Sequence, residues 1–122
     1  DFLIAGGTDF LRSDPEYDMG ITGAIKIAHL GEAFGIDVEI HACGPAHRHV
    51  MATSRNSNFY EVALVGPDCP NTMAPVYACG YSDLIDCIDK DGFVNVPNGV
   101  GLGVQYDWDF IKANTTNLSV FE

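Results

Sequence analysis

The sequence predicts an α/β protein in which strands and helices alternate and the strands run parallel. Residues 1–65 pass through the order strand, helix, strand, helix, strand, with short connections between the elements. That order is typical of parallel strands joined by crossover helices. The chain has 122 residues, of which 47% are hydrophobic and 19% charged. A chain of this size and composition is expected to form one compact domain.

The first strand and the first helix are predicted from residues 8–13 and 24–34. Residues 8–13 form a short run with an apolar centre, and the sequence Ser13-Asp14-Pro15 ends it with a turn signal. In residues 24–34 apolar side chains recur close to the helical period, and Gly35 suits the C-terminal cap. We therefore expect a strand followed by a helix.

A second strand, a second helix and a third strand follow. Residues 36–41 alternate strictly between apolar and polar side chains, which predicts a half-buried strand that ends on His41. Residues 46–54 predict a helix, and residues 59–65 predict a third strand closed by Gly66-Pro67. These three elements complete the alternating β-α-β-α-β pattern.

The remainder of the chain is predicted to be less regular. Proline and cysteine residues interrupt it early, and glycine-rich and aromatic segments follow. The expected elements are a loop at 67–80, a short helix at 82–88, a turn at 89–92, a short strand at 93–96, an aromatic acidic segment at 106–110 and a frayed final dozen residues.

Charge and cysteine content exclude several classes of function. The formal net charge is −11, which disfavours nucleic acid and anionic membrane surfaces as partners. The apolar runs are too short to span a bilayer. The four cysteines form no C-x-x-C pair, and we favour reduced thiols in a cytoplasmic protein over disulfides.

Three polar residues stand at or near the ends of the predicted strands. Asp14 follows the first strand, His41 ends the second, and Glu61 lies within the third. Ligands of parallel α/β proteins bind at the carboxyl ends of strands. A carboxylate beside an imidazole fixes its tautomer and favours its charged form. The three residues therefore form a candidate acid/base site, although each could also be a structural turn or strand-end residue.

Two segments of the sequence contain residue types that bind metal ions. The group His41, Cys43, His47 and His49 has suitable zinc ligands, but its spacing H-x-C-x3-H-x-H matches no familiar zinc motif. Residues 89–92 superficially resemble a calcium loop but lack its first ligand and its closing Glu. A hairpin turn is expected at residues 89–92, and the zinc site stays a less favoured alternative.

The spacing of these residues resembles the C-terminal part of the enolase superfamily, specifically the mandelate racemase subgroup with its acid-sugar dehydratases. There a catalytic Asp ends the sixth barrel strand, a catalytic His ends the seventh, and a Glu lies on the eighth. The intervals of 27 residues from Asp14 to His41 and of 20 residues from His41 to Glu61 match. Residues 91–104 resemble the closing segment, with Val100 where a proline is usual.

The resemblance implies a fold and a division of the chain. It implies the C-terminal part of a (β/α)8 TIM-type barrel over residues 1–88, followed at residues 89–122 by a closing segment that returns toward a capping domain. A complete barrel takes about 250 residues. The magnesium ligands and a Lys-x-Lys base of the family would therefore precede Asp1.

The resemblance also implies an activity: Mg²⁺-dependent removal of the proton α to a carboxylate, followed by dehydration of an acid sugar to a 2-keto-3-deoxy acid. His41 would act as general base or acid, Asp14 would orient it, and a protonated Glu61 would donate to the substrate carboxylate. The polar start of the second helix favours dehydration, with His47 and Arg48 binding the sugar acid. The full-length enzyme is expected to be a homo-oligomer.

Two other hypotheses stay open at this point. One is a racemase, epimerase or cycloisomerase of the same subgroup. The other is a small acidic α/β domain without catalytic function, in which Asp14 and His41 are incidental.

Overall fold

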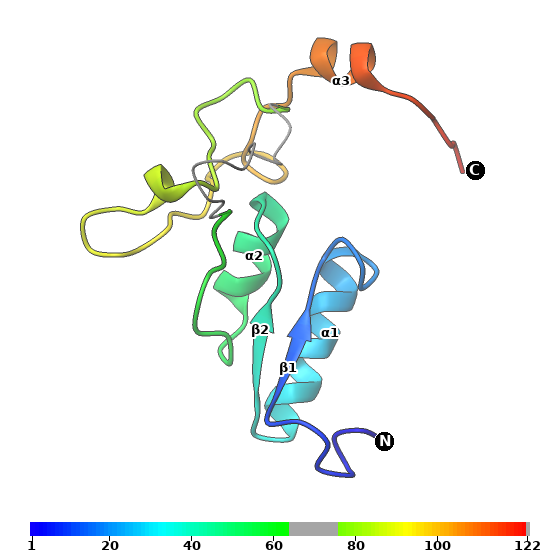
Figure 1. The fold of residues 1–122 in the computed structure, drawn as a ribbon, viewed down its shortest axis with the longest axis vertical. Helices are drawn as coiled ribbons and strands as arrows, with labels where there is room; N and C mark the ends of the chain where they lie inside the picture. Colours follow the sequence, from blue (N-terminus) through cyan, green and yellow to red (C-terminus); the bar gives the residue numbers. More distant parts are fainter. Residues whose placement is uncertain (64–75, 122) are drawn as a thin grey trace, which may run out of the picture.

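A computed structural model describes residues 1–63 and 76–121. Its elements, in chain order, are β1 (Phe10–Ser13), α1 (Gly20–Ala33), β2 (Asp37–Ile40), α2 (Pro45–Thr53), the 3-10 turn η1 (Ile85–Cys87) and α3 (Trp108–Asn114). The two strands and the first two helices form one end of the molecule. Residues 76–121 lie at the other end, beyond α2 (Figure 1). No helix in the described part of the chain is long and apolar enough to cross a membrane.

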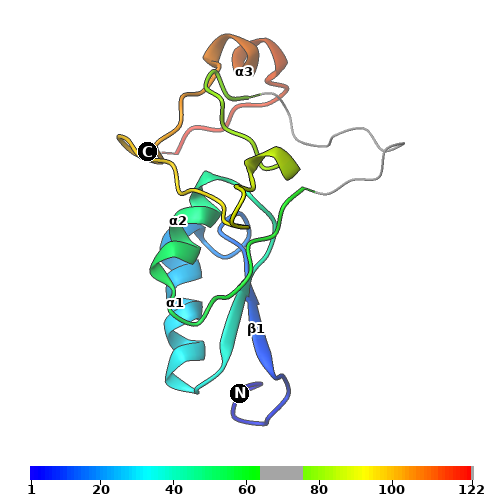
Figure 2. The same cartoon turned by 90° about the vertical axis from the view of Figure 1, so that its left-hand side faces the viewer.

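Strands β1 and β2 pair in parallel, with Ser13 opposite Ile40. Both helices cover the same face of this small sheet (Figure 2). The buried core lies between the sheet and the helices and consists of Ala24, Ala28, Val38, Ile40 and Val50. Because side chains alternate along a strand, the charged side chains of both strands lie on the other, uncovered face.

The turn between β1 and α1 depends on a glycine in the first turn of the helix. A Cβ atom at Gly23 would lie 1.6 Å from the carbonyl oxygen of Asp18, so only glycine lets the chain approach so closely. The Asp18 carboxylate in turn accepts hydrogen bonds from the Ser13 hydroxyl at 3.1 Å and from the Asp14 amide at 2.8 Å. The helix start therefore fixes the chain where β1 ends.

The β-α-β-α order predicted for the first half of the chain is confirmed. The first helix begins four residues earlier than predicted, at Gly20, and the other bounds differ by at most two residues. Parallel pairing of the two strands is also confirmed.

The predicted third strand is wrong over its described part. Residues 59–63 are not in a strand, and the rest of the prediction lies outside the described residues. Strands of parallel sheets are normally buried on both faces, whereas Phe59 and Glu61 are exposed. The segment instead contacts the β2 end through side chains, as when Glu61 accepts a hydrogen bond from the Ala42 amide.

The second half of the chain also differs in detail. The predicted strand at 93–96 is reduced to one antiparallel bridge between Ile88 and Val94. The predicted helix at 82–88 is reduced to η1. Helix α3 extends into the residues predicted to fray, because Asp107 caps it by accepting a hydrogen bond from the Phe110 amide at 2.9 Å. Most of the predicted loop at 67–80 lies outside the described residues.

A buried arginine joins α2 to the second half of the chain. Arg48 donates to the Oδ1 atom of Asp83 at 2.6 Å, to the Asn95 carbonyl at 2.9 Å and to the Ser82 carbonyl. Its guanidinium carbon lies 4.5 Å from the centre of the Tyr81 ring, a cation–π geometry. The side chains of both Arg48 and Asp83 are buried, so this ion pair is shielded from water.

Two tyrosines complete the surroundings of Asp83. The hydroxyl groups of Tyr60 and Tyr81 donate to its Oδ1 atom at 2.5 and 2.9 Å. Burial, together with the hydrogen bond to Asp83, raises the pKa of both phenols above the ordinary value of 10. Both tyrosines therefore stay protonated and act as donors to the buried carboxylate.

We predict that Arg48→Met lowers the free energy of unfolding by about 3–5 kcal/mol, because it leaves Asp83 as a buried charge without a cation. Urea denaturation of the intact protein measures this. The control is Arg55→Met, which removes the exposed ion pair of Arg55 with Glu32. It should change the stability far less, because water screens exposed pairs. Equal decreases in the free energy of unfolding of the two variants would contradict the structural role of Arg48.

Candidate active site

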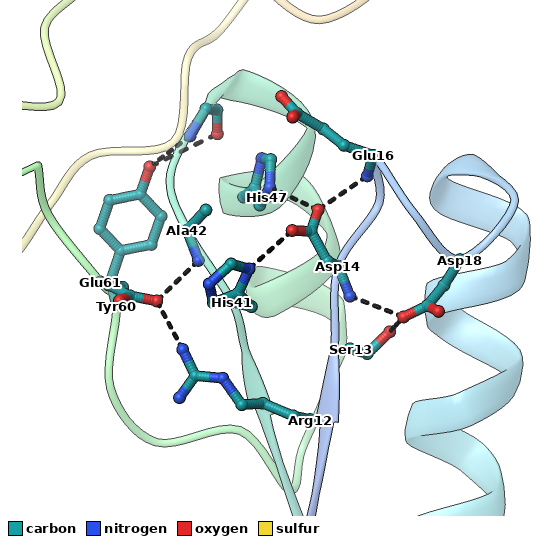
Figure 3. A network of polar contacts seen from close by, with 11 residues as sticks. Arg12, Ser13, Asp14, Glu16, Asp18, His41, Ala42, His47, Tyr60 and Glu61 are labelled. Atoms are coloured by element: carbon teal, nitrogen blue, oxygen red, sulfur yellow. Dashed lines mark hydrogen bonds and ion pairs between the residues drawn. The ribbon is translucent and has the colours of Figure 1, made fainter. Parts of the chain in front are cut away.

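Asp14 is a buried carboxylate at the carboxyl end of β1. The backbone amide of Asp14 donates a hydrogen bond to the Asp18 carboxylate, and the Oδ1 atom of Asp14 accepts one from the Glu16 amide at 2.8 Å. Both bonds are local, within the turn that follows the strand (Figure 3). The turn therefore fixes the position and the orientation of the carboxylate.

His41 comes directly after β2 and lies beside Asp14. The strand register places Ser13 opposite Ile40, so the residues that follow them are neighbours. The Nδ1 atom of His41 lies 2.8 Å from the Oδ2 atom of Asp14, and the His41 amide donates to the Ser13 carbonyl. The predicted contact between imidazole and carboxylate is therefore present, while the catalytic role of the two residues stays a prediction.

A second histidine contacts the same carboxylate. His47 lies in the first turn of α2, and its Nε2 atom is 3.2 Å from the Oδ1 atom of Asp14. The side chain is buried beneath Asp14, whereas His41 is half-exposed. We refer to Asp14, His41 and His47 as the Asp14 cluster. His47 was expected to bind substrate, but the structure places its ring in the interior.

The hydrogen bonds of the Asp14 cluster determine the charge of the carboxylate. Burial alone would raise the pKa of Asp14. Hydrogen bonds from His41, from the Glu16 amide and from His47 outweigh burial and hold the pKa below its usual value of 3.8. Asp14 is therefore an anion at neutral pH, as required of a group that orients an imidazole and stabilises its protonated form.

Glu61 lies close to the Asp14 cluster but in different surroundings. Its Oε2 atom accepts hydrogen bonds from the Ala42 amide at 2.6 Å and from Arg12 at 2.9 Å. Ala42 has a φ of 64°, a conformation that non-glycine residues rarely adopt. The chain therefore turns sharply directly after the amide that donates to Glu61. The structure thus brings Glu61 to the same end of the sheet.

Arg12 is a site residue that the sequence analysis missed. It precedes Asp14 by two positions, so both side chains belong to the same face of the β1 segment. This spacing was the available signal. An open hollow of about 200 Å³ is lined by Arg12, Ser13, Asp14, Asp18 and His41. The Arg12 guanidinium forms an ion pair with Glu61.

The structure does not support the expectation that Arg48 binds substrate. Its side chain is buried, and its donors are taken by Asp83, Tyr60 and the carbonyls of Ser82 and Asn95. A guanidinium satisfied in this way cannot turn toward a ligand without leaving Asp83 unpaired. The prediction that Arg48 lies at the start of a helix is confirmed. Its side chain, however, faces the interior rather than a ligand.

A metal site is not formed by the described residues. Within residues 1–63 and 76–121, no three His, Cys, Asp or Glu side chains gather closely enough to hold an ion. The zinc hypothesis is therefore not supported. His49, for example, contacts the Leu102 carbonyl through Nε2 at 3.1 Å. These residues do not fit a magnesium site either.

The chain is similar in sequence to curated sugar-acid dehydratases. A D-galactonate dehydratase of Xanthomonas oryzae pv. oryzae is 30% identical over 127 residues, covering 94% of this chain and 31% of its own. An L-rhamnonate dehydratase of Saccharopolyspora erythraea is 28% identical over 103 residues, covering 84% of this chain and 26% of its own.

A solved structure is also similar. The crystal structure of D-glucarate dehydratase from Agrobacterium tumefaciens, complexed with magnesium, is 37% identical and superimposes with a TM-score of 0.75. The match covers 93% of this chain and 29% of that one. The chain thus spans less than a third of the length of these relatives.

The match to a family model covers nearly the whole chain. The model, described as enolase C-terminal domain-like, matches residues 1–110. The chain therefore belongs to the enolase C-terminal domain-like family, among relatives that are sugar-acid dehydratases of the enolase superfamily.

Proposed function

We propose that the chain forms the acid/base part of an active site that removes the proton α to a carboxylate and dehydrates an acid sugar to a 2-keto-3-deoxy acid. The observation that supports this most directly is the contact of 2.8 Å between His41 and Asp14 at the ends of two parallel strands. The similarity to dehydratases of three different acid sugars supports the substrate class.

In this proposal His41 transfers the proton. Its Nδ1 atom is bound to Asp14, which leaves Nε2, on the other edge of a half-exposed ring, for the substrate. The ring takes the proton from the α carbon and returns a proton to the hydroxyl group that leaves the next carbon. Water and an enol result, and the enol rearranges to the keto acid. Asp14 stabilises the imidazolium between the two transfers.

Glu61 is proposed to face the substrate carboxylate. Two carboxylates do not approach each other unless a proton or a cation lies between them. Arg12, 2.9 Å from Glu61, carries such a cation, and guanidinium groups bind carboxylates in a fixed geometry. In this arrangement Glu61 and Arg12 together position the charged end of the substrate beside His41.

Magnesium ligands are not found among the described residues, since no three His, Cys, Asp or Glu side chains in residues 1–63 and 76–121 gather closely enough to hold an ion. A metal-dependent step would need ligands from outside residues 1–63 and 76–121. The proposal concerns proton transfer and the orientation of the substrate, which the Asp14 cluster and its neighbours can perform.

We predict that His41→Asn lowers turnover by about 10²–10⁴-fold, because it removes a positioned acid/base group. The assay incubates the intact protein with D-galactonate, L-rhamnonate and D-glucarate in the presence of Mg²⁺ and measures 2-keto-3-deoxy acids. The matched control is His29→Asn, which changes an exposed histidine on α1. An unchanged rate in His41→Asn would remove His41 from the mechanism, and formation of an epimer instead of a keto acid would contradict dehydration.

We also predict a characteristic pH dependence for Asp14→Asn. Because the pKa of Asp14 is lowered in the folded protein, its ionisation stabilises the fold above the unfolded pKa near 3.8. That stability is lost as the pH falls through the lower folded pKa. The variant should therefore be less stable than wild type at neutral pH, and the difference should shrink in acid.

Urea denaturation between about pH 7 and pH 2 measures this difference. Asp9→Asn, which changes an exposed carboxylate, is the control. A stability difference between wild type and Asp14→Asn that stays constant down to the lowest pH would show that the charge of Asp14 does not matter.

A further inference from the structure

We propose that His47 is a positioning residue, a buried imidazole that holds the Asp14 carboxylate so that its other oxygen meets His41. The proposal rests on the proposed role of His41 in proton transfer for its effect on turnover. The contact that carries it, between His47 Nε2 and Asp14 Oδ1 at 3.2 Å, exists whatever the substrate is.

The two oxygens of Asp14 have different partners. Oδ1 accepts from the Glu16 amide at 2.8 Å and contacts His47 at 3.2 Å, while Oδ2 contacts His41 at 2.8 Å. Figure 3 shows each ring facing a different oxygen of the carboxylate. With Oδ1 held from two directions, rotation of the carboxylate about its Cβ–Cγ bond would break two hydrogen bonds. Oδ2 therefore stays directed at His41.

The two histidines differ in their access to solvent. The side chain of His41 is 48% exposed and that of His47 is 2% exposed. A substrate arriving from solvent can meet His41 but not His47. The same carboxylate thus contacts one ring that can exchange protons with a ligand and one ring that can act only through Asp14.

The surroundings of His47 also determine its tautomer. Because Asp14 is ionised and can only accept, Nε2 of His47 carries the hydrogen. Its Nδ1 atom is buried and has no hydrogen-bond partner among the described residues, so a second proton there would find no acceptor. His47 therefore donates to Asp14 from Nε2 in a fixed direction.

Gly44 leaves the space that this ring needs. A Cβ atom at Gly44 would lie 2.8 Å from Nδ1 of His47, closer than side-chain atoms approach one another. The φ of Gly44 is 154°, which L residues also rarely adopt. The absence of a side chain at Gly44 thus leaves room for the ring that reaches Asp14.

The first test needs no substrate. In the intact protein labelled with ¹⁵N-histidine, NMR should show a hydrogen-bonded Nε2–H proton on His47 and a hydrogen-bonded Nδ1–H proton on His41. An Nε2 atom of His47 that carries no hydrogen would overturn the proposal. Because this measurement uses wild-type protein, it decides the geometry even if no acid sugar is turned over.

The second test compares His47→Gln with His47→Asn. The amide nitrogen of Gln reaches about where Nε2 of histidine lies, whereas that of Asn reaches only the position of Nδ1. We expect His47→Gln to keep the His41 Nδ1–H signal and turnover close to wild type. We expect His47→Asn to lose the signal and to lower kcat by about 10–100-fold with little change in KM, because misplaced groups slow the chemical step.

The matched control is His49→Gln, two positions along α2, where the ring contacts the Leu102 carbonyl rather than Asp14. It should leave both readouts unchanged. If the His41 signal persists in His47→Asn, or if Gln and Asn variants behave alike in both readouts, His47 does not position Asp14. If the NMR results hold but no acid sugar is turned over by wild type, the proposed function fails and the positioning of Asp14 stands.

Discussion

The buried charge of Asp14 is the constraint on which the candidate site depends. An ionised carboxylate removed from water is unfavourable unless hydrogen-bond donors surround it. Here the donors come from three separate places: the turn after β1, the end of β2 and the first turn of α2. The strand register, the turn and the helix start must therefore all be formed before this charge is stabilised, which couples the fold to the site.

Helix α2 uses two consecutive residues to satisfy two different buried carboxylates. His47 contacts Asp14 in the α/β part of the molecule, and Arg48 pairs with Asp83 in the second half of the chain. The chain has only 6 Lys and Arg residues against 17 Asp and Glu residues, so an arginine committed to the interior is a substantial share of its positive charge. The first turn of α2 thereby links the Asp14 cluster to residues 76–121.

The sequence predicted those parts of the structure that local patterns determine. Alternation of side chains placed β2 correctly, and its parallel partner brought Asp14 and His41 together. The prediction of a third strand was wrong over residues 59–63. Phe59 and its neighbours have a high strand propensity, but strand pairing also depends on burial, which propensity does not measure. Helix α3 could have been predicted, since Asp107 followed by an acidic first turn is a helix-start signal.

The structural roles of His47 and Arg48 could not be predicted from the sequence, for a different reason. Polar residues at a helix start usually face water, and these two are buried. The residues that explain their burial, Asp14 and Asp83, lie 33 and 35 positions away along the chain. No local periodicity connects such pairs, so only the tertiary structure distinguishes an interior imidazole from one that meets a ligand.

Burial also separates the two functions proposed for the site. The contacts that hold Asp14 all lie between residues 13 and 47 and are largely shielded from water. Glu61 and Arg12, by contrast, hold each other with half of each side chain exposed. The distance between a proton donor and its acceptor must be kept to within a fraction of an ångström, and rigid surroundings maintain it. A pair of exposed charges can rearrange. That freedom suits Arg12, which in the proposed site would contact the carboxylate of a substrate in addition to that of Glu61.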